Sequence, residues 1–337
     1  MWYAFSYYGT ILIRTSEWRW KPIIVQNREE PLLLKGIRFT LKRLHPDHEV
    51  YPLLDTKAVI LKAGLSGEEK LAEVLRNETF SFAHHIIHDL SLESCSLFQI
   101  DSLFLTPYYA VVFEVKNISG RLKFIEKPPQ LIRTRETGEV DGFESPAAQV
   151  ERNSELLGLW LSDRGIQIPL YRVVVLAYPK QIVEKAPTKT RVLFPSLVPS
   201  FLRSLPREKT MLDQKTFKWL TESLLSSRIQ HIPRPVCEMY NISRSAIRTG
   251  VICVDCGMIG MVKIKRSWRC EKCGRRDPKA HEQAIREWFL LIGRELTNRD
   301  CRDFLHVDSD TAYRMMKSMG LTSRGTYKNR SYRMDFT

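Results

Sequence analysis

Apolar residues recur at helical spacing in one part of the chain and at strand spacing in the next. The first pattern predicts a helix over residues 64–77. Ser66 is the expected N-cap of this helix, because Glu69 follows it at the spacing of a capping box. The apolar side of the helix would be formed by Leu71, Ala72 and Leu75.

Three apolar runs follow, and they predict strands over residues 84–90, 97–105 and 109–116. Residues 121–145 are polar and contain prolines and glycines, so we expect a long excursion there. Pro146 favours the start of a helix that would run to about residue 161. Residues 170–178 are continuously apolar, as in a strand buried on both faces. This order of elements predicts an α/β layer.

Two of the predicted strands carry charged residues that would face one another. If the hairpin is symmetric about residues 107–108, Asp101 lies directly opposite Glu114. Lys116 points to the same side as Glu114, because side chains alternate along a strand. Two carboxylates so close on apolar strands repel each other, and a divalent cation with oxygen ligands relieves that conflict.

Two further polar side chains are candidates to join this group. Glu68 lies on the apolar side of the helix over residues 64–77, and Gln149 lies on the helix that begins at Pro146. A charge or amide on such a face needs a partner. The spacing alone equally fits a solvated hairpin end with two satisfied polar side chains, since structural ion pairs give the same pattern.

These segments resemble the nuclease-related domain family, NERD, which is similar to the PD-(D/E)xK nuclease superfamily. The resemblance covers about residues 64–176. It implies a restriction-endonuclease-like αβββαβ core that hydrolyses phosphodiester bonds with Mg²⁺ or Mn²⁺. The motifs that carry it are Gly64-Leu65-Ser66-Gly67-Glu68, Gln99-Ile100-Asp101, Phe113-Glu114-Val115-Lys116-Asn117 with Ser119-Gly120, and Pro146 with Gln149 and Asn153.

The same resemblance implies a role for each site residue. Asp101 and Glu114 would hold the metal, and Lys116 would position the attacking water. Glu68 would be the acidic residue carried by the first helix, and Gln149 a polar support on the second. Ile100 is a departure, because the name of the superfamily places a proline before the aspartate; that position varies within the superfamily.

Four cysteines form two matching Cys-x-x-Cys-Gly motifs near the C-terminal end. Cys253 and Cys256 make the first pair, and Cys270 and Cys273 the second. Such pairs bind one Zn²⁺ from two tight turns, in which the following glycine permits a positive φ. Two redox pairs are the alternative, although neither motif follows a strand-to-helix pattern. We therefore predict a structural zinc ribbon.

The last part of the chain is basic and predicts a helix-turn-helix-like module. Residues 251–337 carry 18 Lys+Arg and 11 Asp+Glu. Helices are expected over residues 281–294, 298–305 and 309–319, with Thr297 and Ser309 capping the second and third. The alternative is a small helical bundle with a solvated basic face. The candidate nucleic-acid-binding residues, on the third helix and a following hairpin, are Arg314, Lys317, Arg324, Lys328 and Arg330.

The charged-residue composition favours an anionic binding partner. The chain of 337 residues has 52 Lys+Arg and 38 Asp+Glu, a formal net charge of +14, which favours nucleic acid. With 43% hydrophobic residues and no long apolar stretch, we expect a folded cytoplasmic protein without a membrane segment. No Gly-rich phosphate loop is present, so no nucleotide cofactor is expected.

The sequence therefore predicts a metal-dependent deoxyribonuclease with an appended DNA-contacting region. The alternative is a DNA-binding or regulatory protein with an inactive nuclease-like fold, and positive charge alone would also suit an RNA-processing partner. The expected parts are an N-terminal extension (1–60), the nuclease-like domain (61–180), a helical linker (181–250), the zinc ribbon (251–276) and the basic helical domain (280–337).

Overall fold

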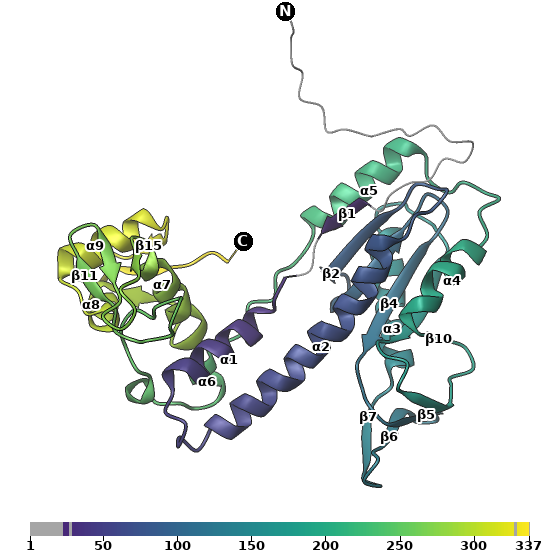
Figure 1. Ribbon diagram of the computed structural model, residues 1–337. Coiled ribbons are helices and arrows are strands. Elements are labelled where there is room, and N and C mark those ends of the chain that lie inside the picture. The colour runs from purple at the N-terminus through teal and green to yellow at the C-terminus, as the bar shows by residue number, and fades with distance from the viewer. Residues whose placement is uncertain (1–22, 27–28, 327–328, 337) are drawn as a thin grey trace, which may run out of the picture. The chain divides into compact units, whose positions relative to one another are not determined.

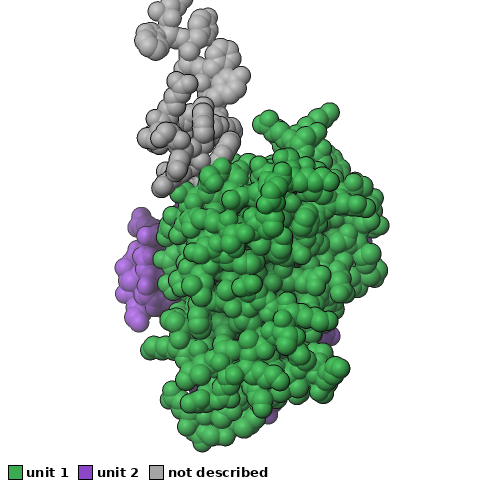
Figure 2. Space-filling model, turned by 90° about the vertical axis from the view of Figure 1, so that its right-hand side faces the viewer, with its two compact units in different colours: residues 1–28, 64–229 green, residues 29–63, 230–337 purple. Residues whose placement is uncertain are grey.

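The computed structural model describes residues 23–26, 29–326 and 329–336. The chain divides into two compact units, which Figure 2 shows in different colours. Unit 1 comprises residues 1–28 and 64–229, and unit 2 comprises residues 29–63 and 230–337. Among the described residues, no helix is long and apolar enough to cross a membrane.

Unit 1 is built on a six-stranded mixed sheet with the strand order β1-β2-β3-β4-β8-β10 (Figure 1). The middle strands β2, β3 and β4 are antiparallel neighbours, whereas β4, β8 and β10 run parallel. The strands are β1 (Ile23–Gln26), β2 (His85–Glu93), β3 (Leu97–Leu105), β4 (Ala110–Lys116), β8 (Leu170–Leu176) and β10 (Arg191–Leu193).

Helices contribute to the apolar cores on both faces of this sheet. Val111, Phe113 and Val115 of β4 belong to a core shared with α2 and α4. Ala110 and Val112 belong to a second core shared with α3 and α5. Strand β4 is therefore buried on both sides, as its continuous apolar sequence requires. The helices are α2 (Tyr51–Asn77), α3 (Pro146–Ser162), the 3₁₀ turn η1 (Pro195–Leu197), α4 (Val198–Ser204) and α5 (Gln214–Ser226).

The register of the β3–β4 hairpin is the one that the sequence predicts. The observed pairs run from Ser102 with Phe113 to Leu105 with Ala110, and their residue numbers sum to 215. Thr106 closes the turn, since its Oγ1 donates to the Tyr109 carbonyl at 2.8 Å. This register carries Asp101 toward Glu114 at the open end of the hairpin.

The excursion predicted over residues 121–145 contains three strands of a second sheet, which were not predicted from the sequence; the order of this sheet is β7-β6-β5-β9. Leu122, Phe124 and Leu131 point into the core, while charged residues alternate with them on the exposed side. Pro128 and Gly138 lie in the turns, whereas Pro129 and Gly142 lie within strands, and together these residues hid the alternation. The strands are β5 (Arg121–Glu126), β6 (Pro129–Thr134), β7 (Val140–Glu144) and β9 (Ile182–Lys185).

The predicted N-cap at Ser66 is also wrong, because the helix begins much earlier. Residues 64–77 are the second half of α2, and the first half contributes Leu54, Ala58 and Leu61 to the core of unit 2. The Ser66 hydroxyl lies inside the helix and forms a hydrogen bond with the Tyr178 hydroxyl at 2.9 Å. A serine before an apolar stripe is therefore a poor indicator of an N-cap when the helical pattern continues upstream of the serine.

Unit 2 has one apolar core formed by two distant parts of the chain. Residues 29–63 belong to it, and residues 181–229 belong to unit 1, so the compact units group the chain differently from the five consecutive parts expected from sequence. The elements of unit 2 are α1 (Leu32–Arg43), α6 (Val236–Met239), η2 (Arg244–Ala246), β11 (Val262–Ile264), β12 (Ser267–Arg269), β13 (Arg276–Asp277), α7 (Ala280–Leu291), β14 (Leu296–Thr297), α8 (Asn298–Leu305), α9 (Ser309–Ser318), β15 (Thr322–Arg324) and β16 (Ser331–Arg333).

A buried ion pair joins the two parts of unit 2. The Arg43 guanidinium lies 2.6 Å from the Glu287 carboxylate, and both side chains are almost completely buried. The same guanidinium donates to the carbonyls of Arg248 and Gly250 at 2.8 and 2.9 Å, and it stacks over the Phe304 ring at 4.7 Å. Each donor of a buried cation needs such an acceptor, so Arg43 fixes α1 against the C-terminal part of unit 2.

Candidate functional site

The charged residues predicted on β3 and β4 meet at one end of the hairpin. Asp101 accepts a hydrogen bond from the Val115 backbone N–H at 2.7 Å through Oδ2, which ties it to β4. Lys116 Nζ donates to Glu114 Oε1 at 2.6 Å. Glu114 is 7% exposed, so this is a buried charge on an otherwise apolar strand. The three side chains are thus brought together as the hairpin register requires.

Burial and a neighbouring like charge both disfavour the ionised form of the Glu114 carboxyl group. Loss of hydration raises its pKa to about 7, and the charge of Asp101 adds to the rise, while Lys116 opposes it. Burial also works against the charge of Lys116, but Glu114, Asp101 and Glu68 together hold its pKa above the usual range. The site therefore holds more negative than positive charge, which a further cation would balance.

The other two predicted residues also reach this site. Glu68 is half-buried on α2, and its charge acts on Lys116. Gln149 on α3 donates from Nε2 to Glu144 at 2.7 Å. Its Oε1 is buried and has no hydrogen-bond partner among the described residues. An orphaned buried acceptor of this kind is rare unless a water or ligand completes it.

Most of these site residues line one polar cavity of about 340 Å³. Its wall on α3 is held by Asn153, whose Nδ2 donates to the Gln99 carbonyl of β3 at 2.7 Å. The ring of polar groups around one hollow has the size and chemistry to take a phosphate and its waters. The residues that line it include Gln99, Asp101, Glu114, Lys116, Gln149, Arg152 and Asn153.

Sequence reasoning missed one member of the site, Glu144. It ends β7, and it accepts hydrogen bonds from Gln149 and from Arg152, at 2.7 and 2.8 Å. These bonds, first that from Gln149, hold the pKa of Glu144 below its usual range. The available signal was its place just before the helix that begins at Pro146, but the segment that contains it was expected to be a long excursion without a site residue.

The donor set fits a hard divalent ion that keeps water ligands. Asp101 and Glu114 offer carboxylate oxygens, the ligand type that Mg²⁺ and Mn²⁺ prefer. Among the described residues, the only group in which three or more His, Cys, Asp or Glu ligand atoms lie within 4.8 Å of one another is the four cysteines. Two carboxylates and several waters suit Mg²⁺, which dehydrates reluctantly and seldom takes an all-protein cage.

Comparison with known proteins finds a family match for the part of the chain that carries this site. Residues 63–177 match NERD, the nuclease-related domain family. The match spans the site from Glu68 to Gln149 and ends just after β8, so it covers the resemblance noted in the sequence. No curated protein and no solved structure matches the chain significantly. The segment that carries the site is therefore nuclease-related by its family match.

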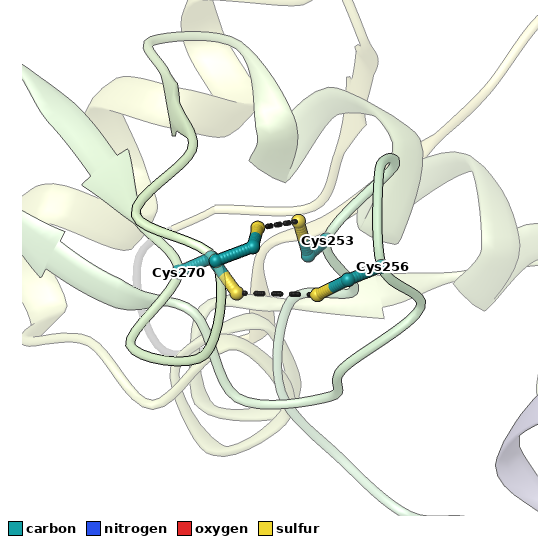
Figure 3. Close-up of side chains that lie close together, drawn as sticks. Cys253, Cys256 and Cys270 are labelled. Atoms are coloured by element: carbon teal, nitrogen blue, oxygen red, sulfur yellow. Dashed lines mark hydrogen bonds between the residues drawn. The ribbon is translucent and has the colours of Figure 1, made fainter.

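Outside the NERD domain, the four cysteines predicted as metal ligands converge in unit 2. Cys253 and Cys256 lie close to Cys270, as Figure 3 shows. The Sγ–Sγ distances are 3.6 Å from Cys253 to Cys273 and 3.5 Å from Cys256 to Cys270. A tetrahedral ion with bonds of about 2.3 Å separates its sulfurs by about 3.8 Å. The cluster can therefore hold one metal ion.

The two cysteine turns have the same backbone geometry. Gly257 N–H donates to the Cys253 carbonyl and Gly274 N–H to the Cys270 carbonyl, each at 2.9 Å. Both glycines have positive φ, +71° and +73°, as the sequence predicts. The close sulfur contacts join one turn to the other, which favours a shared metal site over two separate redox pairs. Of the remaining cysteines, Cys95 is exposed, whereas Cys237 and Cys301 are buried.

The C-terminal elements follow the expected order of three helices and a hairpin. Thr297 caps α8 in a capping box with Asp300, as predicted. The cap of α9 is Asp308 rather than Ser309, which is the first helical residue. Strand β16 pairs with β14 and β15. Arg314, Lys317, Arg324 and Arg330 are all exposed, and Lys328 lies outside the described residues.

Proposed function

We propose that the NERD domain is the catalytic part of a metal-dependent nuclease that hydrolyses phosphodiester bonds in DNA. The observation that carries this proposal is the group of buried Glu114 with partly buried Asp101 and Lys116 on a polar cavity, within a segment that matches a nuclease-related family. The element order of α2, β2, β3, β4, α3 and β8 supports a restriction-endonuclease-like core.

Each of the five predicted site residues can be assigned a role from its position. Asp101 and Glu114 would hold Mg²⁺ or Mn²⁺, which when bound polarises a phosphoryl oxygen and lowers the pKa of a water. Lys116 places a fixed positive charge beside the cavity, where negative charge develops on the phosphoryl group. The free Oε1 of Gln149 is an acceptor for a water in the cavity, and Glu68 helps to keep Lys116 charged.

We further propose that unit 2 contacts DNA through a helix-turn-helix-like module. The turn between α8 and α9 contains His306 in the left-handed conformation, with φ of 59°. Helix α9 then exposes Arg314 and Lys317, and Arg324 follows on β15. Exposed cations on a helix and an adjacent hairpin suit phosphate contacts on a duplex.

The cysteine cluster would hold a structural Zn²⁺ ion. We expect protein purified without chelator to contain about one zinc per chain, because four thiolates close the tetrahedral site. Elemental analysis measures this directly, and replacing Cys253 and Cys273 with serine should remove the zinc. The same replacement at Cys237 and Cys301, which lie outside the cluster, is the matched control. Zinc near zero in the wild-type protein contradicts the assignment.

The nuclease proposal is tested by cleavage of single- and double-stranded DNA with Mg²⁺ or Mn²⁺. We expect cleavage by the wild-type protein and none by the Asp101→Ala/Glu114→Ala variant purified in the same way. The variant Glu155→Ala/Asp163→Ala removes the same charge from exposed positions outside the cavity lining, and it should cleave normally. Equal cleavage by the wild-type protein and the site variant would show a contaminant and overturn the proposal.

The basic surface of unit 2 keeps a second candidate function open, that of a DNA-binding regulator with an inactive nuclease-like fold. It predicts DNA binding without cleavage of either substrate at any metal concentration. The paired charges of Asp101, Glu114 and Lys116 favour the enzyme, because a site that had lost its chemistry would have no need of a buried carboxylate beside a second, partly buried one.

A further inference from the structure

Unit 1 contains a second hollow that the proposed catalytic site does not use. It measures about 740 Å³ and is bounded by the start of β8, by β10 and by α4. Three cations and two aromatic rings line it: Arg172, Lys189, Arg191, Tyr171 and Phe201. We call it the β8–α4 groove.

The cations of this groove are available to a ligand. Among the described residues, none of the three forms an ion pair within 4.0 Å, whereas many other arginines of unit 1 do. Arg172 and Arg191 are exposed, and Arg191 lies over the Phe201 ring at 5.5 Å. Glu126 acts on Lys189, but it already accepts two hydrogen bonds from Thr188. A hollow lined by cations that form no close ion pair attracts anions.

The aromatic residues give the groove a second chemical feature. Phe201 is half-buried on α4, and Tyr171 is braced edge-on against Tyr109, with ring centroids 5.7 Å apart. Flat rings next to cations are the combination that binds nucleotides, because bases stack on the rings while phosphates meet the cations. The pairing of phosphate and base recognition identifies the ligand as a nucleotide or a strand built of nucleotides.

We propose that the β8–α4 groove binds a single-stranded segment of nucleic acid. The proposed nuclease function supplies the identity of this ligand, and the inference rests on it to that extent. A strand fits better than a free nucleotide because the groove has about twice the volume of the catalytic cavity. Much of its lining is also exposed, including Leu197, which is 51% exposed.

The place of the groove in the sheet separates it from the catalytic cavity. Arg172 on β8 pairs with Val112, whereas Glu114 pairs with Val174 further along the same parallel strands. Helix α4 belongs to the core shared with α2, whereas α3, which lines the cavity, belongs to the opposite core. The groove would therefore hold a part of the strand away from the scissile bond, around the β10 edge of the sheet (Figure 1).

The test measures binding of three fluorescent probes: an oligothymidylate, a blunt duplex and a thymidine mononucleotide. Binding is measured without added divalent ions or chelator, so that cleavage does not occur and the cysteine site keeps its metal. We expect Arg172→Gln/Arg191→Gln to weaken binding of the oligothymidylate about tenfold or more. The salt dependence should also fall, with a slope smaller by about 1.4, since two phosphate contacts are lost. Phe201→Leu should weaken binding without changing this slope, because only stacking is lost.

The matched control is Lys123→Gln/Lys127→Gln, which removes two exposed charges of the same unit outside the groove. Wild-type affinity in the groove variant, or an equal loss in the control, would overturn the proposal, as diffuse charge would then explain binding. A mononucleotide that binds as tightly as the oligothymidylate would overturn it in favour of a free-nucleotide site. A duplex that loses as much affinity as the oligothymidylate in the groove variant would overturn the single-strand assignment. Cleavage is not measured, so a failure here leaves the test of Asp101 and Glu114 unaffected.

Discussion

Replacing Lys116 with methionine should lower the metal-dependent cleavage rate by about 10²–10³-fold. Its ammonium group lies 2.6 Å from Glu114, and Lys116 lines the same cavity as Asp101 and Glu114. Methionine keeps the aliphatic stem and removes the charge that would face the phosphoryl group. Single-turnover cleavage at saturating Mn²⁺ measures the chemical step and separates it from weaker metal binding.

DNA affinity should change by no more than about threefold in the same variant, because the exposed cations proposed to contact DNA lie elsewhere in the chain. Lys116→Arg is the conservative control, and it should retain part of the rate since it keeps the charge. An unchanged cleavage rate in Lys116→Met would show that this lysine has no part in the chemistry. A parallel loss of binding and cleavage would instead indicate a structural role.

Replacing Arg43 with methionine should destabilise unit 2 by about 3–5 kcal/mol. Glu287 would remain buried without its cation, and the carbonyls of Arg248 and Gly250 would lose their donor. Hydrogen exchange of the α7 amides reports on unit 2 alone, and it should become faster by about two to four powers of ten. The full-length protein is used, so unit 1 serves as an internal reference.

Arg38→Met is the matched control for this prediction. Arg38 lies on the same helix, and its side chain is 56% exposed and paired with the partly exposed Glu30. A surface pair of this kind contributes about 0–1 kcal/mol, so exchange in α7 should hardly change. The double variant Arg43→Met/Glu287→Leu should recover part of the lost stability, because no unpaired charge is left. Equal exchange in Arg43→Met and Arg38→Met contradicts the structural role of Arg43.

Much of the candidate site was predictable because it depends on short-range rules. The alternation of β4 places Glu114 and Lys116 on one side, and the short turn at Thr106 fixes the register that brings Asp101 opposite. The cysteine turns depend only on two spacings and two glycines. Such features are encoded within one hairpin or one turn, so one sequence is enough to find them.

What escaped prediction depends on contacts between distant segments. Arg43 and Glu287 are 244 residues apart, and nothing in either neighbourhood shows that they meet. The division of α2 between two cores has the same cause, since the helical period of Leu54 and Leu71 is the same although they serve different units. The second sheet was missed for a different reason, namely that turn residues around β5 and β6 masked a short alternation.

Binding of Mn²⁺ to the zinc-loaded protein tests the proposed catalytic centre most directly, because it does not depend on choosing the right DNA. Calorimetric titration should show about one Mn²⁺ site per chain in the wild-type protein. The site should be lost in Asp101→Asn/Glu114→Gln and kept in Glu155→Gln/Asp163→Asn. Equal binding by all three proteins, or no binding by the wild type, would contradict the assignment of Asp101 and Glu114 as metal ligands.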